Sequence, residues 1–547
     1  MKVEHARKIG FFSALAMSLG TIIGIGIFFK NIPIIKAQAI ENSDMFSFWS
    51  GIVSWIIAAV IILCAAISFS KIATNYSSNG GLASWTENLS REVSTTRLGG
   101  KMKIQYLGRF VRIQHSAYYL GIFAGVLPFL AVEGLYNAID IAVNNTPSGQ
   151  VHFGYIFLGG FIILISLIGI NFLSSRGSRS SSYIQNTSML LKIIPLGIAL
   201  IIGLSNINQS NILDKNVNDL MNSPIKDLYP TDITKQLIPT TTIFNVKGMF
   251  IALPSILFAF DSFTNVGNLP DRVNNPKKTI PIVLVVSIII ASIVYILIAI
   301  GAGFTGFGDV GTIFKTLVPD NLANAASIRK GLDITINIFV TISAIGVVNG
   351  MSFTLFESCK SLIGSGQIMG WKKLSVLNEK YNNRGTLILI LIITCSFNII
   401  IGSVATIVNN DALVDSVTNF PTLFFIPIYA IVLLLGSIQR NRFVRNSKTI
   451  SFEIITGIAI LGFFVVFGYF FFYQYIYEVI ANANMDSNSG LFFNSNIGAQ
   501  KWKNYDDAIV FWVLLAWFIS FPFINHFVIK KTGGYKVSFN DAIIEHK

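Results

Sequence analysis

The chain has 547 residues, of which 52% are hydrophobic and only 12% are charged, and its mean hydropathy is +0.63. Soluble globular domains carry about 25% charged residues, so this composition excludes a soluble enzyme or binding domain. The net charge of +13 alone would be compatible with nucleic acid binding, and the placement of the basic residues decides against that interpretation.

Apolar segments of about 20 residues recur along the whole chain, as in transmembrane helices. The first is too long for the apolar region of a cleaved signal peptide. The predicted fold class is therefore an all-α polytopic membrane protein, with residues 1–547 forming a single transmembrane domain. In chain order, the twelve predicted spans are 11–29, 49–73, 116–137, 153–173, 183–204, 248–269, 280–304, 333–358, 385–405, 416–437, 450–477 and 508–529.

Lysine and arginine residues fall unevenly on the two sides of these spans. The N-terminus, the C-terminal tail and every second loop hold 27 of the 40, the other loops hold 11, and Lys71 and Lys192 lie within spans. Basic residues accumulate on the cytoplasmic side of membrane proteins. We therefore expect both termini, including the tail at residues 530–547, to be cytoplasmic. This topology accounts for the basic charge, so we expect no nucleic acid partner.

Two hydrophilic segments are long, residues 74–115 on the inside and 205–247 on the outside. Neither is long enough to indicate a folded catalytic domain, and the second, rich in Asn and Asp, predicts a flexible loop. The sequence has no GxxxxGK[ST] motif, and Cys64, Cys359 and Cys395 have no paired spacing. The histidines are scattered without metal-ligand spacing. We expect no cofactor, no metal and no ATP-driven pump.

The first span has an unusual sequence for a helix in lipid. The stretch LGTIIGIGIFFKN at residues 19–31 contains Gly20, Gly24 and Gly26, and each glycine weakens a helix by about 0.5–1 kcal/mol relative to alanine. One interpretation is close helix packing, because Gly20-xxx-Gly24 matches a small-xxx-small pattern. The other is a broken helix whose freed backbone groups bind a ligand, which is tolerated at membrane depth only where the backbone lines a cavity or is buried.

The sixth span contains a second interruption. Pro254 removes a backbone donor, and Asp261 places a carboxyl group near the middle of the span. A charge at that depth costs about 2.5–3.5 kcal/mol on insertion scales, so such residues usually face a pocket or pathway. Ser262, Thr264 and Asn265 continue the polar stretch. Paired interrupted spans in two halves of a chain are typical of a transporter binding site, which favours the broken-helix interpretation of the glycines.

Several motifs in and around these two spans are shared with a known family. They are Gly20-Thr-Ile-Ile-Gly24-Ile-Gly26-Ile-Phe28, Phe258-Ala-Phe-Asp-Ser-Phe263, Asn268-Leu, Asn275-Pro-Lys-Lys-Thr-Ile-Pro281, Gly80-Gly81 and Asn171. Through them the chain resembles the amino acid–polyamine–organocation (APC) superfamily of permeases over about residues 9–440.

Three features depart from the pattern of this family. Lys71 stands where Glu is frequent, and Ser77 stands where Pro is frequent. The arginine usual at the end of the eighth span is absent, with Glu357 and Lys360 nearby instead. These departures concern contacts at the inner gate more than the fold.

The resemblance implies a fold of two inverted five-helix repeats, residues 9–204 and 248–437, followed by two peripheral helices within 450–529. It also implies that helices 1 and 6 are broken and that the substrate lies between them.

The resemblance places the substrate carboxylate at the amides of Ile25, Gly26 and Ile27, where a half-helix N-terminus has unpaired N–H groups and a partial positive charge. The α-ammonium would meet the carbonyls of Ile22, Phe258, Ala259 and Asp261. Phe260 resembles the aromatic residue that gates the pocket in this family. The expected substrate-binding residues are Ile22, Ile23, Gly24, Ile25, Gly26, Ile27, Phe258, Ala259, Phe260, Asp261 and Ser262.

Three polar residues within spans have open roles. Asp261 could contact a cationic substrate, titrate during transport, or only cap the broken helix. Asn349 is a weak pocket candidate whose alternative role is a helix–helix hydrogen bond. Lys192 in span five is costly in lipid unless it is paired or loses its proton, or unless it snorkels to the interface.

Lys192 also matches a position of the family. In its sodium-independent members, a lysine of the fifth span occupies the place where sodium binds in related transporters. The resemblance therefore implies a coupling role for Lys192 and no sodium requirement. Whether this residue carries protons or serves as a fixed charge stays open.

The expected function is secondary active transport of amino acids across the cell membrane by alternating access, sodium-independent and proton-coupled. An exchanger would use the same site, and Asp261 keeps a polyamine or another organic cation as an alternative substrate. A channel is less favoured because it gives no reason for two broken spans. An enzyme is not expected, since the sequence lacks clusters of catalytic His, Asp or Glu. The expected partners are an amino acid, protons and the lipid bilayer.

Overall fold

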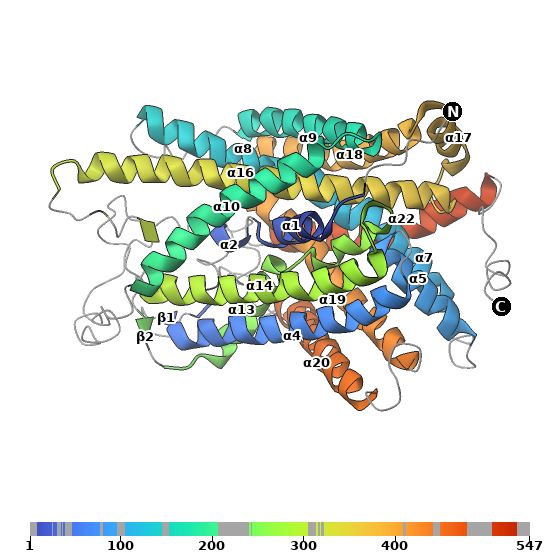
Figure 1. Ribbon diagram of the computed structural model, residues 1–547, viewed down its shortest axis with the longest axis horizontal. Coiled ribbons are helices and arrows are strands. Elements are labelled where there is room, and N and C mark those ends of the chain that lie inside the picture. The colour runs from blue at the N-terminus through green and yellow to red at the C-terminus, as the bar shows by residue number, and fades with distance from the viewer. Residues whose placement is uncertain are drawn as a thin grey trace.

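The structure is a computed structural model of the chain. It describes residues 8–24, 26–29, 34, 37–38, 46–76, 80–95, 104–144, 153–205, 240–241, 243–304, 313–314, 318, 322–408, 412–440, 449–477 and 506–532. Helices dominate these residues, and the long ones run side by side along the horizontal direction of Figure 1. The all-α polytopic fold predicted from the sequence is confirmed.

The first half of the chain begins with a short helix and continues with several long ones. Its helices are α1 (Phe11–Ile22), α2 (Gly26–Phe29), α4 (Phe48–Asn75), α5 (Gly81–Ser94), α7 (Gln105–Gln114), η1 (His115–Leu120), α8 (Gly121–Asn144), α9 (Phe153–Ser175) and α10 (Ser180–Ser205). Two-residue strands β1 (Phe46–Ser47) and β2 (Thr240–Thr241) pair in parallel, with Phe46 opposite Thr240.

The second half of the chain has the same general character. Its helices are α13 (Val246–Ala259), η4 (Phe263–Asn268), η5 (Pro270–Arg272), α14 (Pro276–Phe304), α16 (Ala325–Gly364), α17 (Trp371–Tyr381), α18 (Arg384–Val408), α19 (Ala412–Ile438), α20 (Thr449–Gly468), η8 (Tyr469–Tyr477) and α22 (Asp506–Lys531).

Eleven helices within the described residues are long and apolar enough to cross a membrane. The first predicted span is the exception, because its helix α1 ends after 12 residues at Ile22. Two spans are longer than predicted by more than ten residues: one continuous helical stretch runs from Gln105 to Val143, and α16 covers 40 residues. Helical hydrogen bonds continue beyond the apolar stretch into polar ends, which a hydropathy pattern does not register. The two inverted repeats stay a prediction.

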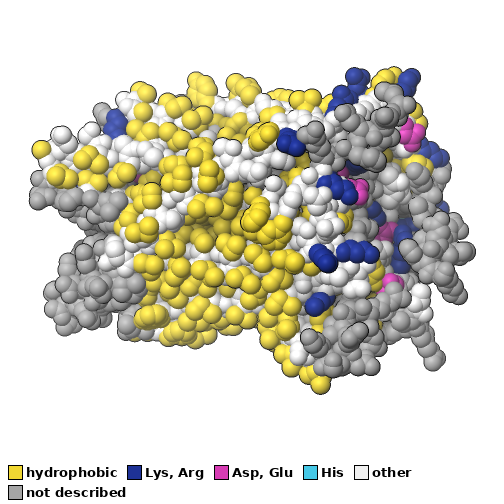
Figure 2. Space-filling view, in the orientation of Figure 1, with side chains coloured by type: hydrophobic (Ala, Val, Ile, Leu, Met, Phe, Trp, Pro, Cys, Tyr) yellow, Lys and Arg dark blue, Asp and Glu magenta, His cyan; other side chains and the backbone are white. Residues whose placement is uncertain are grey.

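Hydrophobic side chains cover the middle of the visible surface, and Lys and Arg side chains gather at the right-hand end (Figure 2). Exposed apolar side chains such as Ile162, Ile201 and Ile392 contribute to this surface. Inside, helices approach closely where both carry glycine: a Cβ on Gly203 of α10 would lie 2.5 Å from the Cα of Gly301 of α14. Small residues allow such close helix contacts in lipid.

The predicted inner segment 74–115 is largely helical. It contains α5 and the whole of α7, which hydropathy did not separate because both helices are short and polar on one face. Gly80 and Gly81 have φ angles of +108° and +49°, and a Cβ on Gly81 would lie 2.8 Å from the carbonyl carbon of Gly267. The glycine pair therefore lets α5 approach η4. The predicted flexible loop, residues 205–247, lies mostly outside the described residues.

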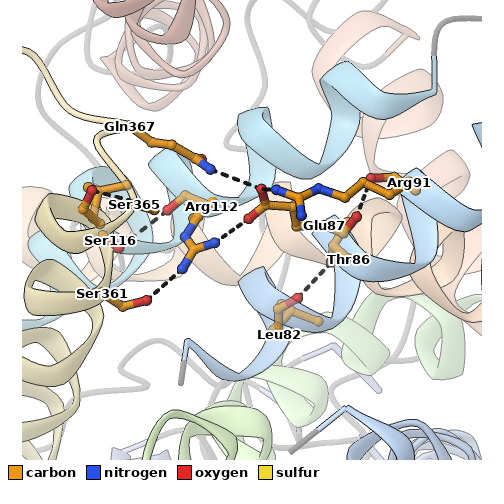
Figure 3. Close-up of polar contacts among 11 residues, drawn as sticks. Leu82, Thr86, Glu87, Arg91, Arg112, Ser116, Ser361, Ser365 and Gln367 are labelled. Carbon is orange, nitrogen blue, oxygen red and sulfur yellow. Dashed lines mark hydrogen bonds and ion pairs between the residues drawn. The ribbon is translucent and has the colours of Figure 1, made fainter. Parts of the chain in front are cut away.

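A charged cluster joins α5, α7 and the segment after α16 (Figure 3). The buried Glu87 carboxylate accepts hydrogen bonds from Arg112, from Arg91 at 2.5 Å and from Gln367 at 3.0 Å. Arg112 also donates to the Ser361 hydroxyl at 2.6 Å. Burial raises the pKa of Glu87, but the charges of Arg112 and Arg91 outweigh burial and hold this pKa below its ordinary value. Glu87 is therefore ionised at neutral pH.

We expect Glu87→Gln to lower the melting temperature of the purified protein by several degrees at pH 7. Losing one partner of a buried ion pair costs about 3 kcal/mol, because the other charge is left unpaired. Since the folded pKa of Glu87 is depressed, its contribution is present above the ordinary carboxyl pKa and is lost as the pH falls through the folded pKa. Thermal melts should therefore show the difference between wild type and variant shrinking below pH 4.5.

Glu379→Gln is the matched control, because Glu379 lies exposed on α17. It should melt like the wild type at both pH values. An equal effect of the two substitutions would contradict the stabilising role of Glu87.

Candidate functional site

The first predicted span is interrupted at its glycines. α1 ends at Ile22, and the chain bends at Ile23 and Gly24 before α2 begins at Gly26. The amide of Ile23 still donates to Leu19 O at 2.7 Å. The helix of this segment is therefore broken, as the second interpretation expected. Close packing also occurs, because a Cβ on Gly24 would lie 2.6 Å from Val347 Cγ2. Ile25 lies outside the described residues.

The sixth span is interrupted after α13 ends at Ala259. The amide of Asp261 donates to Phe258 O at 3.0 Å, and Ser262 then adopts a left-handed conformation with φ of +69°. Such a conformation is uncommon for a non-glycine residue and must be held by its surroundings. The amide of Ser262 donates to Asp261 Oδ1 at 2.7 Å, so the aspartate side chain supports the turn that ends the helix.

The two interruptions lie against each other. A Cβ on Gly26 would lie 3.1 Å from the Cα of Ala259, so glycine permits this approach. The hydroxyl of Tyr295 on α14 lies 2.8 Å from Ile22 O and 3.1 Å from Ala259 O, and it can donate to either carbonyl. Tyr295 thus connects the ends of both broken helices. No sequence pattern indicates this role of Tyr295, because a tyrosine in an apolar span also fits an ordinary core position.

Asp261 is buried and its carboxylate is bound by α19. Thr422 donates to Oδ2 at 2.5 Å, and Tyr429 donates to Oδ1 at 3.2 Å. With the amide of Ser262, three donors surround this carboxylate. Among the roles that the sequence left open, this geometry favours capping of the broken helix.

Lys192 on α10 is fully buried, and its Nζ donates to Gly20 O and Ile23 O at 2.9 Å each. It does not snorkel to the interface. The carbonyl end of a helix carries a partial negative charge, so the ammonium group sits where the broken α1 favours a cation. Lys192 therefore lies beside the break in the first span, and its coupling role stays a prediction.

Asn349 serves as a contact between helices. Its side chain donates to Ser181 O at 3.0 Å and to Gln185 Oε1 at 3.1 Å, both on α10.

At the Lys- and Arg-rich end, Glu357 of α16 lies 2.8 Å from Arg272 of η5. An arginine that follows the sixth span therefore approaches the end of the eighth, where the resemblance leads one to expect an arginine of the eighth span itself. No sequence pattern indicates this role of Arg272.

A small cavity of about 30 Å³ lies between the two interruptions. It has room for about one water molecule, whereas small-molecule pockets measure about 300–1,000 Å³. A ligand of amino acid size therefore requires movement of the surrounding side chains. The cavity is lined by Thr21, Ile22, Gly24, Gly26, Phe123, Leu127, Phe258, Ala259, Asp261, Ser262, Val347 and Met351.

Seven of the eleven predicted binding residues therefore line one cavity. Ile23, Ile27 and Phe260 are buried beside it. The ring of Phe260 packs against Trp55 and Tyr295, with ring centroids 6.1 Å and 5.1 Å away, and does not line the cavity. The lining residues from α8 and α16 could not be assigned from sequence, because apolar residues of a span look alike whether they face a cavity, lipid or another helix.

Comparison with known proteins relates the chain to one protein family and to several individual proteins. The profile of the amino acid permease family matches residues 9–493. The chain is 24% identical over 388 residues to an uncharacterized protein of Mycoplasma pneumoniae, covering 68% of this chain and 63% of that protein. It is 21% identical over 299 residues to the methylthioribose transporter of Bacillus subtilis, covering 54% of each chain. These alignments span less than two thirds of both relatives.

A longer alignment relates the chain to the serine/threonine exchanger SteT of Bacillus subtilis. The two are 20% identical over 471 residues, which covers 84% of this chain and 90% of SteT.

We expect Gly24→Ala to destabilise the protein by roughly 1–3 kcal/mol, as overpacking of a full interior does. The added methyl group would lie 2.6 Å from Val347 Cγ2, a stiff branched side chain. Thermal melts of the purified protein measure the loss. Adding Val347→Ala removes the obstructing methyl and should restore part of the stability in the double variant. Additive losses in the double variant would contradict the proposed collision.

Proposed function

We propose that this chain, which belongs to the amino acid permease family, is a secondary transporter that moves amino acids across the cell membrane by alternating access. The observation that carries the proposal is the contact between two broken helices at the level of the apolar band, with a cavity between them. The similarity to SteT, a serine/threonine exchanger, supports an amino acid as the substrate. Irregular backbone at this depth is otherwise costly, which supports a binding role.

In this proposal both charged ends of the substrate bind to backbone. The carbonyl ends of α1 and α13 suit the α-ammonium, because a helix C-terminus carries partial negative charge. The amides of residues 25–27, where α2 begins, suit the carboxylate. Tyr295 then donates to one of the two carbonyls at Ile22 and Ala259, and the substrate ammonium replaces it at the other. Recognition through the backbone leaves the substrate side chain to be selected by apolar residues such as Phe123 and Met351.

The proposed orientation places both termini in the cytoplasm. Supporting this, Lys and Arg side chains gather at the end of the molecule that carries α5, α7 and α17 (Figures 1 and 2). The proposed arrangement of two inverted repeats, residues 9–204 and 248–437, would assign one broken helix to each half.

The proposed coupling is sodium-independent, with protons as the driving ion. Its support is the buried ammonium group of Lys192, which already provides a cation at the carbonyls of Gly20 and Ile23. A second candidate is obligatory exchange of amino acids, favoured by the long alignment with SteT. Both mechanisms use the same binding site.

Uptake into proteoliposomes tests the proposed function. Labelled amino acids are offered in sodium-free buffer, with and without an inward proton gradient, to empty vesicles and to vesicles preloaded with amino acid. Accumulation driven by the gradient supports proton-coupled import, and uptake that requires preloading supports exchange. Absence of amino acid movement in every condition would overturn the proposed substrate class and direct the test to polyamines.

We expect Lys192→Met to reduce amino acid uptake at least tenfold in either mechanism, because the carbonyls of Gly20 and Ile23 lose their cationic donor at the break in α1. Initial uptake rates at matched reconstitution levels measure the loss. Lys71→Met is the matched control: Lys71 also lies within a predicted span, but its side chain is exposed on α4. Uptake by the Lys192 variant at the control rate would remove Lys192 from the transport mechanism.

A further inference from the structure

A second and larger cavity opens at the Lys- and Arg-rich end of the molecule. Its volume is about 220 Å³, below the roughly 300 Å³ at which pockets for drug-sized ligands begin, so its ligand must be small. Its lining comes from the start of α1, the end of α9, the start of α10 with the connection between these two helices, η5 and α16. The lining residues are Lys8, Ile9, Gly10, Ser13, Ser174, Gly177, Ser178, Arg179, Ser182, Tyr183, Asn186, Arg272 and Phe353.

The charge of this lining has one sign. Lys8, Arg179 and Arg272 contribute three cationic groups, and the described lining contains no carboxylate. Arg272 is balanced from behind by Glu357 of α16, at 2.8 Å. The exposed side chains of Lys8 and Arg179 have no hydrogen bond or ion pair with any other described residue. Two uncompensated positive charges therefore face one polar cavity.

The neutral lining is rich in hydrogen-bond donors. Ser13 on α1 and Ser182 on α10 are half-buried, and within the described chain their hydroxyl groups have no partner. Arg272 is already fixed in place, since its Nη1 donates to Ser174 O at 3.3 Å and its Nε donates to Glu357 at 2.8 Å. A site with a fixed guanidinium, further cations and several free donors suits an anion with several acceptor oxygens.

Backbone groups add to the positive electrostatic potential of this cavity. α1 begins beside Gly10 without a side-chain cap, and neither α1 nor α10 has an acidic residue in its first turn. The positive ends of both helices therefore border the cavity through Ser13 and Ser182. These helix ends strengthen a site that the cationic side chains and the cavity already define.

We propose that this cavity binds a small phosphate-type oxyanion, and that the bound anion holds the start of α1 against the start of α10 and against η5. Lys8, Arg179 and Arg272 come from these three segments, so one polyvalent anion contacts all of them. The phosphate group is either free or part of a phosphomonoester lipid headgroup. This proposal is independent of transport, since anion binding can be measured on the purified chain.

Thermal melting of the full-length protein in detergent provides the first test, with inorganic phosphate replacing chloride at constant ionic strength. We expect a saturable rise in melting temperature for the wild type. In the double variant Lys8→Gln/Arg179→Gln, the apparent Kd for phosphate should rise at least tenfold. The matched control Lys373→Gln/Arg384→Gln removes one exposed lysine and one exposed arginine near α17, and should change this Kd by less than twofold.

Native mass spectrometry distinguishes the two sources of the phosphate group. Wild type and both double variants are incubated with phosphatidic acid or with phosphatidylcholine, and the retained lipid is counted. A phosphate response in lipid-free detergent that is lost only in Lys8→Gln/Arg179→Gln supports a free anion. Retention of phosphatidic acid by wild type and control, without a phosphate response, supports a lipid headgroup.

Two outcomes would overturn the proposal. The first is no response to either phosphate or phosphatidic acid beyond that of chloride or phosphatidylcholine. The second is an equal response of the two double variants, which would mean that only general surface charge is involved. Because both substituted side chains in each variant are exposed, all four single sites tolerate glutamine without loss of a buried contact.

Discussion

The structure depends on how backbone groups are satisfied where two helices stop inside an apolar bundle. Without water, each freed carbonyl or amide needs a partner from the protein. Lys192 supplies two hydrogen bonds to carbonyls at the end of α1, and Tyr295 lies within hydrogen-bond distance of one carbonyl from each break. The breaks are therefore stable because α10 and α14 carry donors at the right depth.

Sharing one hydroxyl group makes the two breaks interdependent. The hydroxyl of Tyr295 has a single hydrogen, so Ile22 O and Ala259 O compete for it, and a cation bound at one carbonyl would leave the hydroxyl for the other. Asp261 differs from Tyr295 in that its partners are already in place: its carboxyl group accepts hydrogen bonds from α19 and from its own turn. The adaptable group at the site is thus a neutral hydroxyl, while the carboxyl group of Asp261 is already held by its donors.

The sequence predicted the positions of the breaks better than their partners. Glycines in the first span and Asp261 in the sixth lie at the breaks and can be read from the chain, whereas Pro254 lies inside α13, which continues to Ala259. Tyr295 and Thr422 act through tertiary contacts with residues 36 and 161 positions away, and in sequence they resemble any tyrosine or threonine of a span. Helix α5 escaped prediction for a different reason, since hydropathy separates membrane from solvent and not a short surface helix from a loop.

The contact between α5 and η4 connects the break in the sixth span with the charged cluster around Glu87. Gly81 leaves no free space against Gly267, so a shift of η4 toward α5 must displace α5 as well. Helix α5 is held by the ion pair between Glu87 and Arg112. Arg112 also donates a hydrogen bond to Ser361, near the C-terminal end of α16. Movement of η4 is therefore opposed by ion pairs and not only by apolar packing.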